Sequence, residues 1–287
     1  MEMVRVHPQN DADRVRSFLA RSDPDDYLLE GLDEWVREGR LWALVDRGEW
    51  LGFGRLHDLG DGEGWASGFR VMAGRRGQGL GSELLRGILE DARAVGIHAV
   101  RAVIEDGNLA SRRLFERCGF ASVAELALRC GRPRSGSAHP LRLAAPGASL
   151  DGPVGWVAQN TGRVDLVPGN DGGRFGRWRP TLVARWAREG KLYMGSGLAI
   201  AVQEDWWAHP RTLWVNPLQG ELEALVAALD ALTAERSHDE WQAFLPSSET
   251  LRAEYEHAGL VPHPFWGDRV RLYERFDDRS GGPNSEA

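Results

Sequence analysis

The chain has 287 residues, a formal net charge of −7 at pH 7, 42% hydrophobic residues and two cysteines. This length and apolar content are sufficient for two domains of ordinary size. The negative charge argues against nonspecific nucleic-acid binding, which needs a basic face. The scattered histidines lack metal-site spacing, and Cys118 and Cys130 are too few for a disulfide framework. Because no apolar run of about 18 residues is present to span a membrane, we expect a soluble, cytoplasmic protein without a metal.

The first part of the chain predicts an antiparallel meander of three strands. Apolar and aromatic runs are separated there by two turn signals, Arg47-Gly48-Glu49 and Gly60-Asp61-Gly62. The predicted strands cover residues 41–47, 50–59 and 64–72.

A glycine-rich segment at residues 74–81 follows the meander. Apolar residues then recur with helical spacing until Gly96, which predicts an amphipathic helix. A strand over residues 97–104 comes next, and a second short helix runs from Leu109 to a stop at Gly119. The predicted order is therefore strand, glycine loop, helix, strand, helix.

The sequence also contains an internal repeat. The segment WVREGRLW at 35–42 recurs as WAREGKLY at 186–193, with five of eight positions identical. Further matches pair 69–71 with 213–215, and 111–120 with 251–260. The second half carries NPLQGE where the first has its glycine cluster. We therefore predict two related halves, of which only the first keeps the loop chemistry.

A stretch rich in proline, glycine and serine separates these halves and resembles an interdomain linker. The predicted boundaries are a first domain at 1–132, a linker at 133–141, a second domain at 142–277 and a disordered tail at 278–287.

The glycine loop has the chemistry of a phosphate cradle. Glycines between a strand and a helix let backbone N–H groups approach an anion, and the helix N-terminus adds partial positive charge. The spacing of Gly77, Gly79 and Gly81 is not the G-x-G-x-x-G of a dinucleotide fold. No Gly-Lys-Ser/Thr follows either, as a nucleoside triphosphate loop requires. The loop therefore predicts a site for a different phosphate group.

Residues 76–81, Arg-Gly-Gln-Gly-Leu-Gly, resemble the pyrophosphate loop of the GNAT acyltransferase superfamily, whose pattern is Arg/Gln-x-x-Gly-x-Gly/Ala. The surrounding order is similar too: Val71 precedes the loop, Asn108 follows the next strand, and Gly119-Phe120 ends the last helix. This resemblance covers residues 1 to about 130, and the second half through the repeat only. It implies an α/β (α+β) fold of two tandem GNAT-like domains, each a mixed, mostly antiparallel sheet flanked by helices.

The resemblance also implies an acetyl-CoA-dependent N-acetyltransferase that transfers the acetyl group directly to a primary amine of a small molecule or peptide. In that family the pyrophosphate binds the loop amides, and pantetheine lies between two splayed strands, here those ending at Val71 and Ile104. A backbone N–H near Val71 would polarise the thioester. A homodimer is left open. The implied coenzyme A-binding residues are Val71, Arg76, Gly77, Gln78, Gly79, Leu80, Gly81, Ser82, Asn108 and Phe115.

The groups expected for proton transfer are incomplete. Many family members carry a tyrosine in the last helix to protonate the leaving thiolate, and that position here is Phe115. Tyr255 occupies the matching place in the second half, where we interpret it as a packing residue. Glu105 is the candidate base, with His57 and the acidic run 23–26 as alternatives. The alternative function is a catalytically weak or inactive acyl-CoA-binding module with a regulatory or partner-binding role.

Overall fold

The computed structural model describes residues 1–29, 32–37, 40–134, 141–148, 150, 166–170, 174–204, 211–264 and 266–277. The chain forms two compact units. Unit 1 contains Met1–Val103, Asn108–Ala121 and the chain from Tyr273 onwards; unit 2 contains Ile104–Gly107 and Ser122–Leu272. Most of the predicted linker and all of the predicted tail lie outside the described residues.

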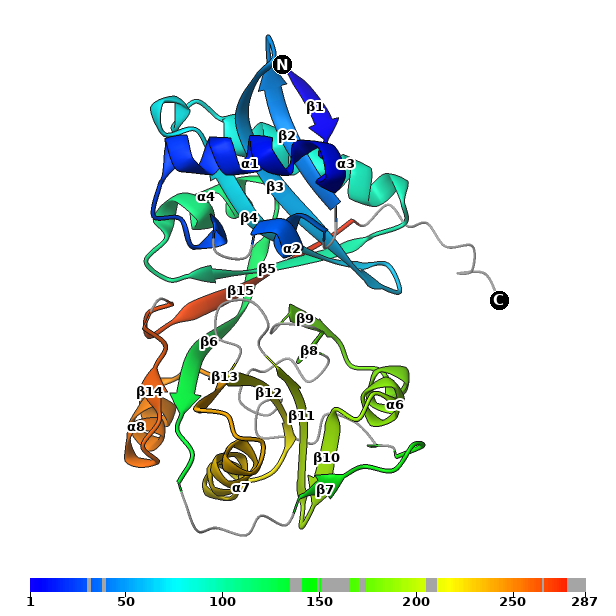
Figure 1. Ribbon diagram of the computed structural model, residues 1–287, viewed down its shortest axis with the longest axis vertical. Coiled ribbons are helices and arrows are strands. Elements are labelled where there is room, and N and C mark those ends of the chain that lie inside the picture. The colour runs from blue at the N-terminus through cyan, green and yellow to red at the C-terminus, as the bar shows by residue number, and fades with distance from the viewer. Residues whose placement is uncertain are drawn as a thin grey trace, which may run out of the picture. The chain divides into compact units, whose positions relative to one another are not determined.

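Unit 1 follows the predicted order of elements (Figure 1). It begins with β1 (Glu2–Arg5), α1 (Pro8–Ser22), the 3-10 turn η1 (Tyr27–Leu29) and α2 (Leu32–Arg37). The predicted meander is confirmed as β2 (Arg40–Asp46), β3 (Glu49–Gly60) and β4 (Glu63–Val71). The predicted loop, helix, strand and helix follow as η2 (Ala73–Arg75), α3 (Leu80–Ala94), β5 (Ala99–Glu105) and α4 (Leu109–Arg117).

Helices cover both faces of the unit 1 sheet, because successive residues of a strand point to opposite sides. On one face, Phe18 of α1 and Trp35 of α2 pack edge-on against Phe53, with ring centroids 5.2 and 5.8 Å away. On the other face, the backbone of Gly54 lies close to Ile88 of α3. The meander therefore lies between α1 and α2 on one side and α3 on the other (Figure 1).

The strands β4 and β5 pair only over a short stretch. Their parallel ladder joins Glu63–Trp65 to Ala99–Arg101, and beyond it the two strands diverge. Against β3, the register of β4 shifts between Phe53 and Arg55, so that Gly68 and Phe69 together oppose Gly54. This is a β-bulge, and Gly68 adopts the left-handed φ of +68°. The sheet thus opens at the end of β4 that precedes the glycine loop.

The last strand of the chain completes unit 1. From Tyr273 onwards, β15 (Val270–Phe276) lies next to β5 in the strand order. The Arg101 guanidinium donates to Glu274 at 2.6 Å and to Glu63 at 3.1 Å, and all three side chains are buried. On the other face of β15, the Tyr273 hydroxyl donates to Glu116 of α4 at 2.9 Å. β15 therefore contacts both the sheet and α4 of unit 1.

The sheet strands of unit 2 follow the order β7-β10-β11-β12-β13-β6, with β14 also paired to β6. All its pairs are antiparallel except β12 with β13. Its elements are β6 (Ala121–Gly131), β7 (Arg142–Leu143), the hairpin β8 (Leu166–Asn170) and β9 (Arg174–Arg177), α6 (Pro180–Arg188), β10 (Leu192–Gly195), β11 (Leu198–Glu204), β12 (Thr212–Gln219), α7 (Leu222–Glu235), β13 (Glu240–Pro246), α8 (Glu249–His257) and β14 (Val261–Pro262).

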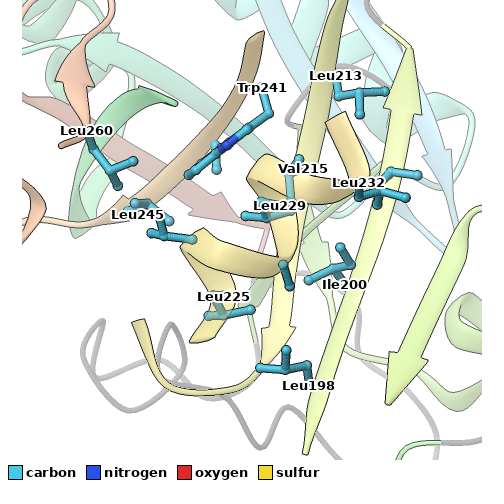
Figure 2. Close-up of a cluster of buried hydrophobic side chains, with 14 of the residues drawn as sticks. Leu198, Ile200, Leu213, Val215, Leu225, Leu229, Leu232, Trp241, Leu245 and Leu260 are labelled. Atoms are coloured by element: carbon cyan, nitrogen blue, oxygen red, sulfur yellow. The ribbon is translucent and has the colours of Figure 1, made fainter. Parts of the chain in front are cut away.

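The core of unit 2 forms where α7 packs on its sheet (Figure 2). Leu225, Leu229 and Leu232 recur at helical spacing and belong to the same buried cluster as Val215 of β12 and Trp241 of β13. The indole N–H of Trp241 donates to the Asp230 carboxylate at 2.8 Å, which satisfies a polar group inside this apolar layer.

The two units share several local features. In each unit, one parallel ladder has three residue pairs. The ladder of β4 with β5 ends at Trp65, and the ladder of β12 with β13 ends at Trp214. The predicted match of 69–71 with 213–215 is therefore wrong in register, because Val71 lies six residues past its ladder and Val215 only one.

No helix in the described part of the chain is long and apolar enough to cross a membrane.

The buried arginine of unit 1 provides a test of this packing. Replacing Arg101 with Met would remove the buried guanidinium that pairs with Glu63 and Glu274, and we expect it to lower the free energy of unfolding by about 3–5 kcal/mol. The control is Arg16→Met, which removes only the exposed pair of Arg16 with Asp33 and should cost less than about 1 kcal/mol. Urea denaturation measures both, and equal small losses would contradict the buried network.

Candidate functional site

The glycine loop leaves open space beside its backbone. Gly77 and Gly79 have left-handed φ values of +78° and +83°, which glycine adopts without strain. A Cβ atom added at either position would meet no heavy atom within 4 Å. Another group can therefore approach the main chain closely at both residues.

The same loop presents a row of unpaired donors. Among the residues that the structure describes, none accepts a hydrogen bond from the backbone N–H groups of Gly77 to Gly81. The next two, of Ser82 and Glu83, donate to the Gly79 carbonyl at 3.0 and 3.1 Å. No side chain in the described part of the chain caps the N-terminus of α3, so the partial positive charge of this helix end adds to these donors. The loop therefore fits a phosphate-bearing group.

The side chains of the other predicted residues in and near this row differ in their surroundings. A Cβ at Gly81 would lie 3.3 Å from Leu114, so this glycine lets α3 approach α4. Leu80 is buried, and Gln78 is exposed. Asn108 caps α4, because its side-chain oxygen accepts from the Ser111 N–H at 3.1 Å. The structure thus brings all of these predicted positions together in unit 1.

The amide of Val71 points away from β3. Met72 donates to Leu51 at 2.9 Å, and Val71 faces Gly52 in the register. In an antiparallel ladder, pairs that exchange hydrogen bonds alternate with pairs that do not. Val71 and Gly52 form the second kind, so the Val71 N–H points to the side from which β5 has diverged. The Val71 carbonyl accepts from Arg76 Nε at 3.4 Å.

Phe115 lies inside an aromatic cluster of unit 1. Its ring is buried and packs edge-on against Phe69 and Phe120, with centroids 5.5 and 4.8 Å away. The position that carries the thiolate acid in many family members therefore contributes apolar packing here. Tyr255 of unit 2 is also buried and donates to the Pro246 carbonyl at 2.7 Å, which agrees with its interpretation as a packing residue.

Glu105 is the last residue of β5 and has an exposed side chain. Desolvation by the surrounding protein raises the pKa of its carboxyl above the ordinary value. It groups with unit 2, whereas the loop belongs to unit 1. Its role as the base therefore stays a prediction.

His57, an alternative candidate for the base, and the thiol of Cys118 lie in different surroundings. His57 is half-buried on β3, opposite Trp65. Burial raises the pKa of the Cys118 thiol, which opposes thiolate formation. No metal-ligating cluster of histidine, cysteine or acidic side chains occurs within the described ranges.

One contact near the loop was not foreseen from the sequence. Arg70, the residue before Val71, forms a two-pronged ion pair with Asp26 of the predicted acidic run. The two residues are 44 positions apart, and no spacing rule connects them.

Unit 2 lacks a comparable cradle in front of α7. Gly220 precedes this helix, and a Cβ added there would lie 2.3 Å from a Leu198 side-chain atom. The space that is open at Gly77 and Gly79 is therefore filled by an apolar side chain at Gly220.

Residues 10–120 match the model of the Acetyltransferase (GNAT) family. Over 46 residues, 16% of its length, the chain is 52% identical to the L-methionine sulfoximine/L-methionine sulfone acetyltransferases of Pseudomonas paraeruginosa and Pseudomonas aeruginosa. The match spans only 27% of those relatives.

Two solved structures resemble the chain over nearly its whole length. A Thermoplasma acidophilum protein classed as an acetyltransferase aligns with 96% of this chain and 100% of its own, at a TM-score of 0.65 and 14% identity. A GCN5-related N-acetyltransferase from Sphaerobacter thermophilus aligns with 96% and 95%, at a TM-score of 0.61 and 18% identity. At these identities the likeness concerns the fold.

The open loop predicts a specific effect of adding one methyl group. Gly79→Ala should weaken coenzyme A binding about tenfold or more, because its Cβ would occupy the space beside the donor row and disturb hydrogen bonds to a charged group. Gly48→Ala is the matched control, since Gly48 has a φ of +81° and equally open surroundings in the turn after β2. Isothermal titration calorimetry measures both affinities, and equal affinities would contradict the cradle.

Proposed function

We propose that this protein is an acetyl-CoA-dependent N-acetyltransferase whose cofactor binds in unit 1. The observation that carries the proposal is the row of unpaired N–H groups from Gly77 to Gly81 at the start of α3. It belongs to a segment that matches the GNAT family, whose members use acetyl-CoA. An uncapped helix start with free amides is suited to bind a pyrophosphate.

Several other residues fit the rest of the cofactor. Arg76 and Ser82 flank the donor row and would assist in binding the pyrophosphate. The divergence of β4 from β5 beyond Trp65 leaves a strand edge for the amide groups of pantetheine. When bound, acetyl-CoA supplies an activated thioester, and the outward-pointing Val71 N–H would donate to its carbonyl oxygen.

Proton transfer follows a direct route in this proposal. The acceptor amine attacks the thioester carbon while Glu105, or a water bound to it, takes the amine proton. Phe115 offers no proton to the departing sulfur. Coenzyme A can leave as the thiolate, because an ordinary thiol has a pKa of only about 8.5.

The acceptor we propose is the primary amine of a small molecule. The Pseudomonas relatives act on two amino-acid derivatives, which makes amino acids and their oxidised or sulfoximine analogues the first compounds to test.

The second half of the chain is proposed to be a related domain that has lost its cofactor loop. The short parallel ladder of β12 with β13 and the capping of α8 by Ser248, which matches that of α4 by Asn108, support this relation. Leu198 fills the space beside Gly220. The domain boundaries at 1–132 and 142–277 stay predictions, since the compact units assign residues 122–134 to unit 2 and the chain from 273 to unit 1.

The second candidate function is an acyl-CoA-binding module with little turnover. The observation that favours it is Phe115, whose buried ring replaces the usual acid. In this case acetyl-CoA would stabilise the protein against heat without any acetylated product.

A thiol-release assay separates these functions. Incubation with acetyl-CoA and a panel of amino acids, aminoglycosides and peptides should release free coenzyme A in a saturable manner with at least one acceptor. Thermal stabilisation by acetyl-CoA without release would support the binding module. The absence of both effects would contradict either function.

The proposed base predicts a pH dependence. Glu105 must be deprotonated to accept a proton, so kcat/KM should fall as the pH drops through the pKa of Glu105. Because that pKa is raised above the ordinary 4.5, the fall should begin at a higher pH than for an ordinary glutamate. Glu105→Gln should lower kcat about a hundredfold or more and remove this acid limb. Glu90→Gln, at an exposed position of α3, is the control, and an unchanged profile in Glu105→Gln would exclude Glu105 as the base.

A further inference from the structure

The segment that carries the Val71 amide is held by strand pairing on one side only. The ladder with β5 ends at Trp65, so from Gly68 to Val71 the strand β4 pairs with β3 but not with β5. The bulge at Gly68 and Phe69 further interrupts the pairing with β3. The direction of the Val71 N–H therefore depends on restraints other than a regular ladder.

Arg70 supplies such a restraint through its side chain. Its Nε and Nη2 atoms donate to the two carboxylate oxygens of Asp26, at 2.5 and 3.0 Å. Its Nη1 atom donates to the Phe69 carbonyl at 3.2 Å, which lies within the bulge. A guanidinium bound at both edges has little freedom to rotate, and it is attached to the backbone immediately before the Val71 amide.

Asp26 is itself fixed in place. Its side chain is only 4% exposed, and its Oδ1 atom also accepts the Leu28 N–H at 3.0 Å. The ring of Tyr27 lies 5.3 Å from the Arg70 guanidinium. Burial disfavours the charge on Arg70, but the hydrogen bond and attraction from Asp26, together with Tyr27, outweigh it and raise the pKa of the guanidinium. The guanidinium therefore keeps its charge, and Asp26 lies directly before the turn η1.

A second contact joins the same region to the residue after Val71. The Ser22 hydroxyl, at the end of α1, donates to the Met72 sulfur at 3.4 Å. Val71 thus lies between two residues, Arg70 and Met72, that are both tied to the connection between α1 and α2.

We propose that Asp26 is a positioning residue for acetyl transfer: by clamping Arg70, it fixes the direction of the Val71 N–H toward the thioester oxygen. The inference rests on the proposed function. Both carboxylate oxygens of Asp26 are occupied by Arg70 and the Leu28 amide, so this side chain orients the backbone rather than binding the acceptor amine. The acid thus acts on the reaction through Arg70 and the peptide that follows it.

The test is Asp26→Asn, which keeps the size of the side chain and removes its charge. We expect kcat to fall about tenfold or more, because a misdirected oxyanion donor loses most of its effect. The dissociation constant of acetyl-CoA should stay within about twofold, because the loop amides are untouched. The infrared carbonyl band of bound acetyl-CoA, labelled with ¹³C at the carbonyl, should move back toward its position in free acetyl-CoA.

The matched control is Asp33→Asn, which removes a carboxylate of α2 from an exposed ion pair with Arg16. This variant should leave kcat and the carbonyl band unchanged. If Asp26→Asn does not fold, Arg70→Lys serves instead, because an ammonium group cannot bind both carboxylate oxygens in the same forked geometry. Arg70→Lys should cause the same loss of the carbonyl shift.

Three results would overturn the proposal: an unchanged kcat in Asp26→Asn, a lower kcat with an unchanged carbonyl band, or a change confined to the KM of the acceptor. Failure of the wild-type protein to bind acetyl-CoA or release coenzyme A would instead contradict the proposed function. The two failures are therefore distinguishable.

Discussion

The divergence of β4 from β5 is the constraint on which the rest of unit 1 depends. Three parallel pairs hold the strands together as far as Trp65, and a bulge at Gly68 and Phe69 follows in the pairing of β4 with β3. A separated strand edge exposes backbone groups that a regular sheet would have paired. The Val71 amide and the loop that leads into α3 both follow from this single interruption.

An open sheet needs compensation elsewhere, and charged side chains provide much of it here. Where the strands are still paired, Arg101 joins Glu63 of β4 to Glu274 of β15 inside the unit. Where β4 pairs with β3 but no longer with β5, Asp26 clamps Arg70. Buried ion pairs of this kind require accurate geometry, because displacing one partner leaves a buried charge that neither the partner nor water stabilises. They suit a region in which one backbone amide must keep its direction.

The two units differ in the space beside the glycines that precede α3 and α7. Gly77 and Gly79 face open space, whereas Gly220 faces Leu198 at a distance that already excludes a Cβ atom. The side chains of Leu198 and Leu225 thus fill the approach that an anion would need. Both helices that follow have buried apolar faces, so the difference lies in the ends of the helices and not in their packing.

Sequence alone determined the meander, the glycine loop and the helices α3 and α4, together with the resemblance of the first half to the GNAT family. These features depend on local patterns: alternation, helical spacing and glycines at positions of left-handed φ. The tertiary structure decided that Phe115 belongs to an aromatic cluster, that Asp26 reaches Arg70, and that the strand holding Arg101 and α4 comes from the last residues of the chain. Such contacts join residues 44 to 173 positions apart, and no local pattern records them because only the folded chain brings their side chains together.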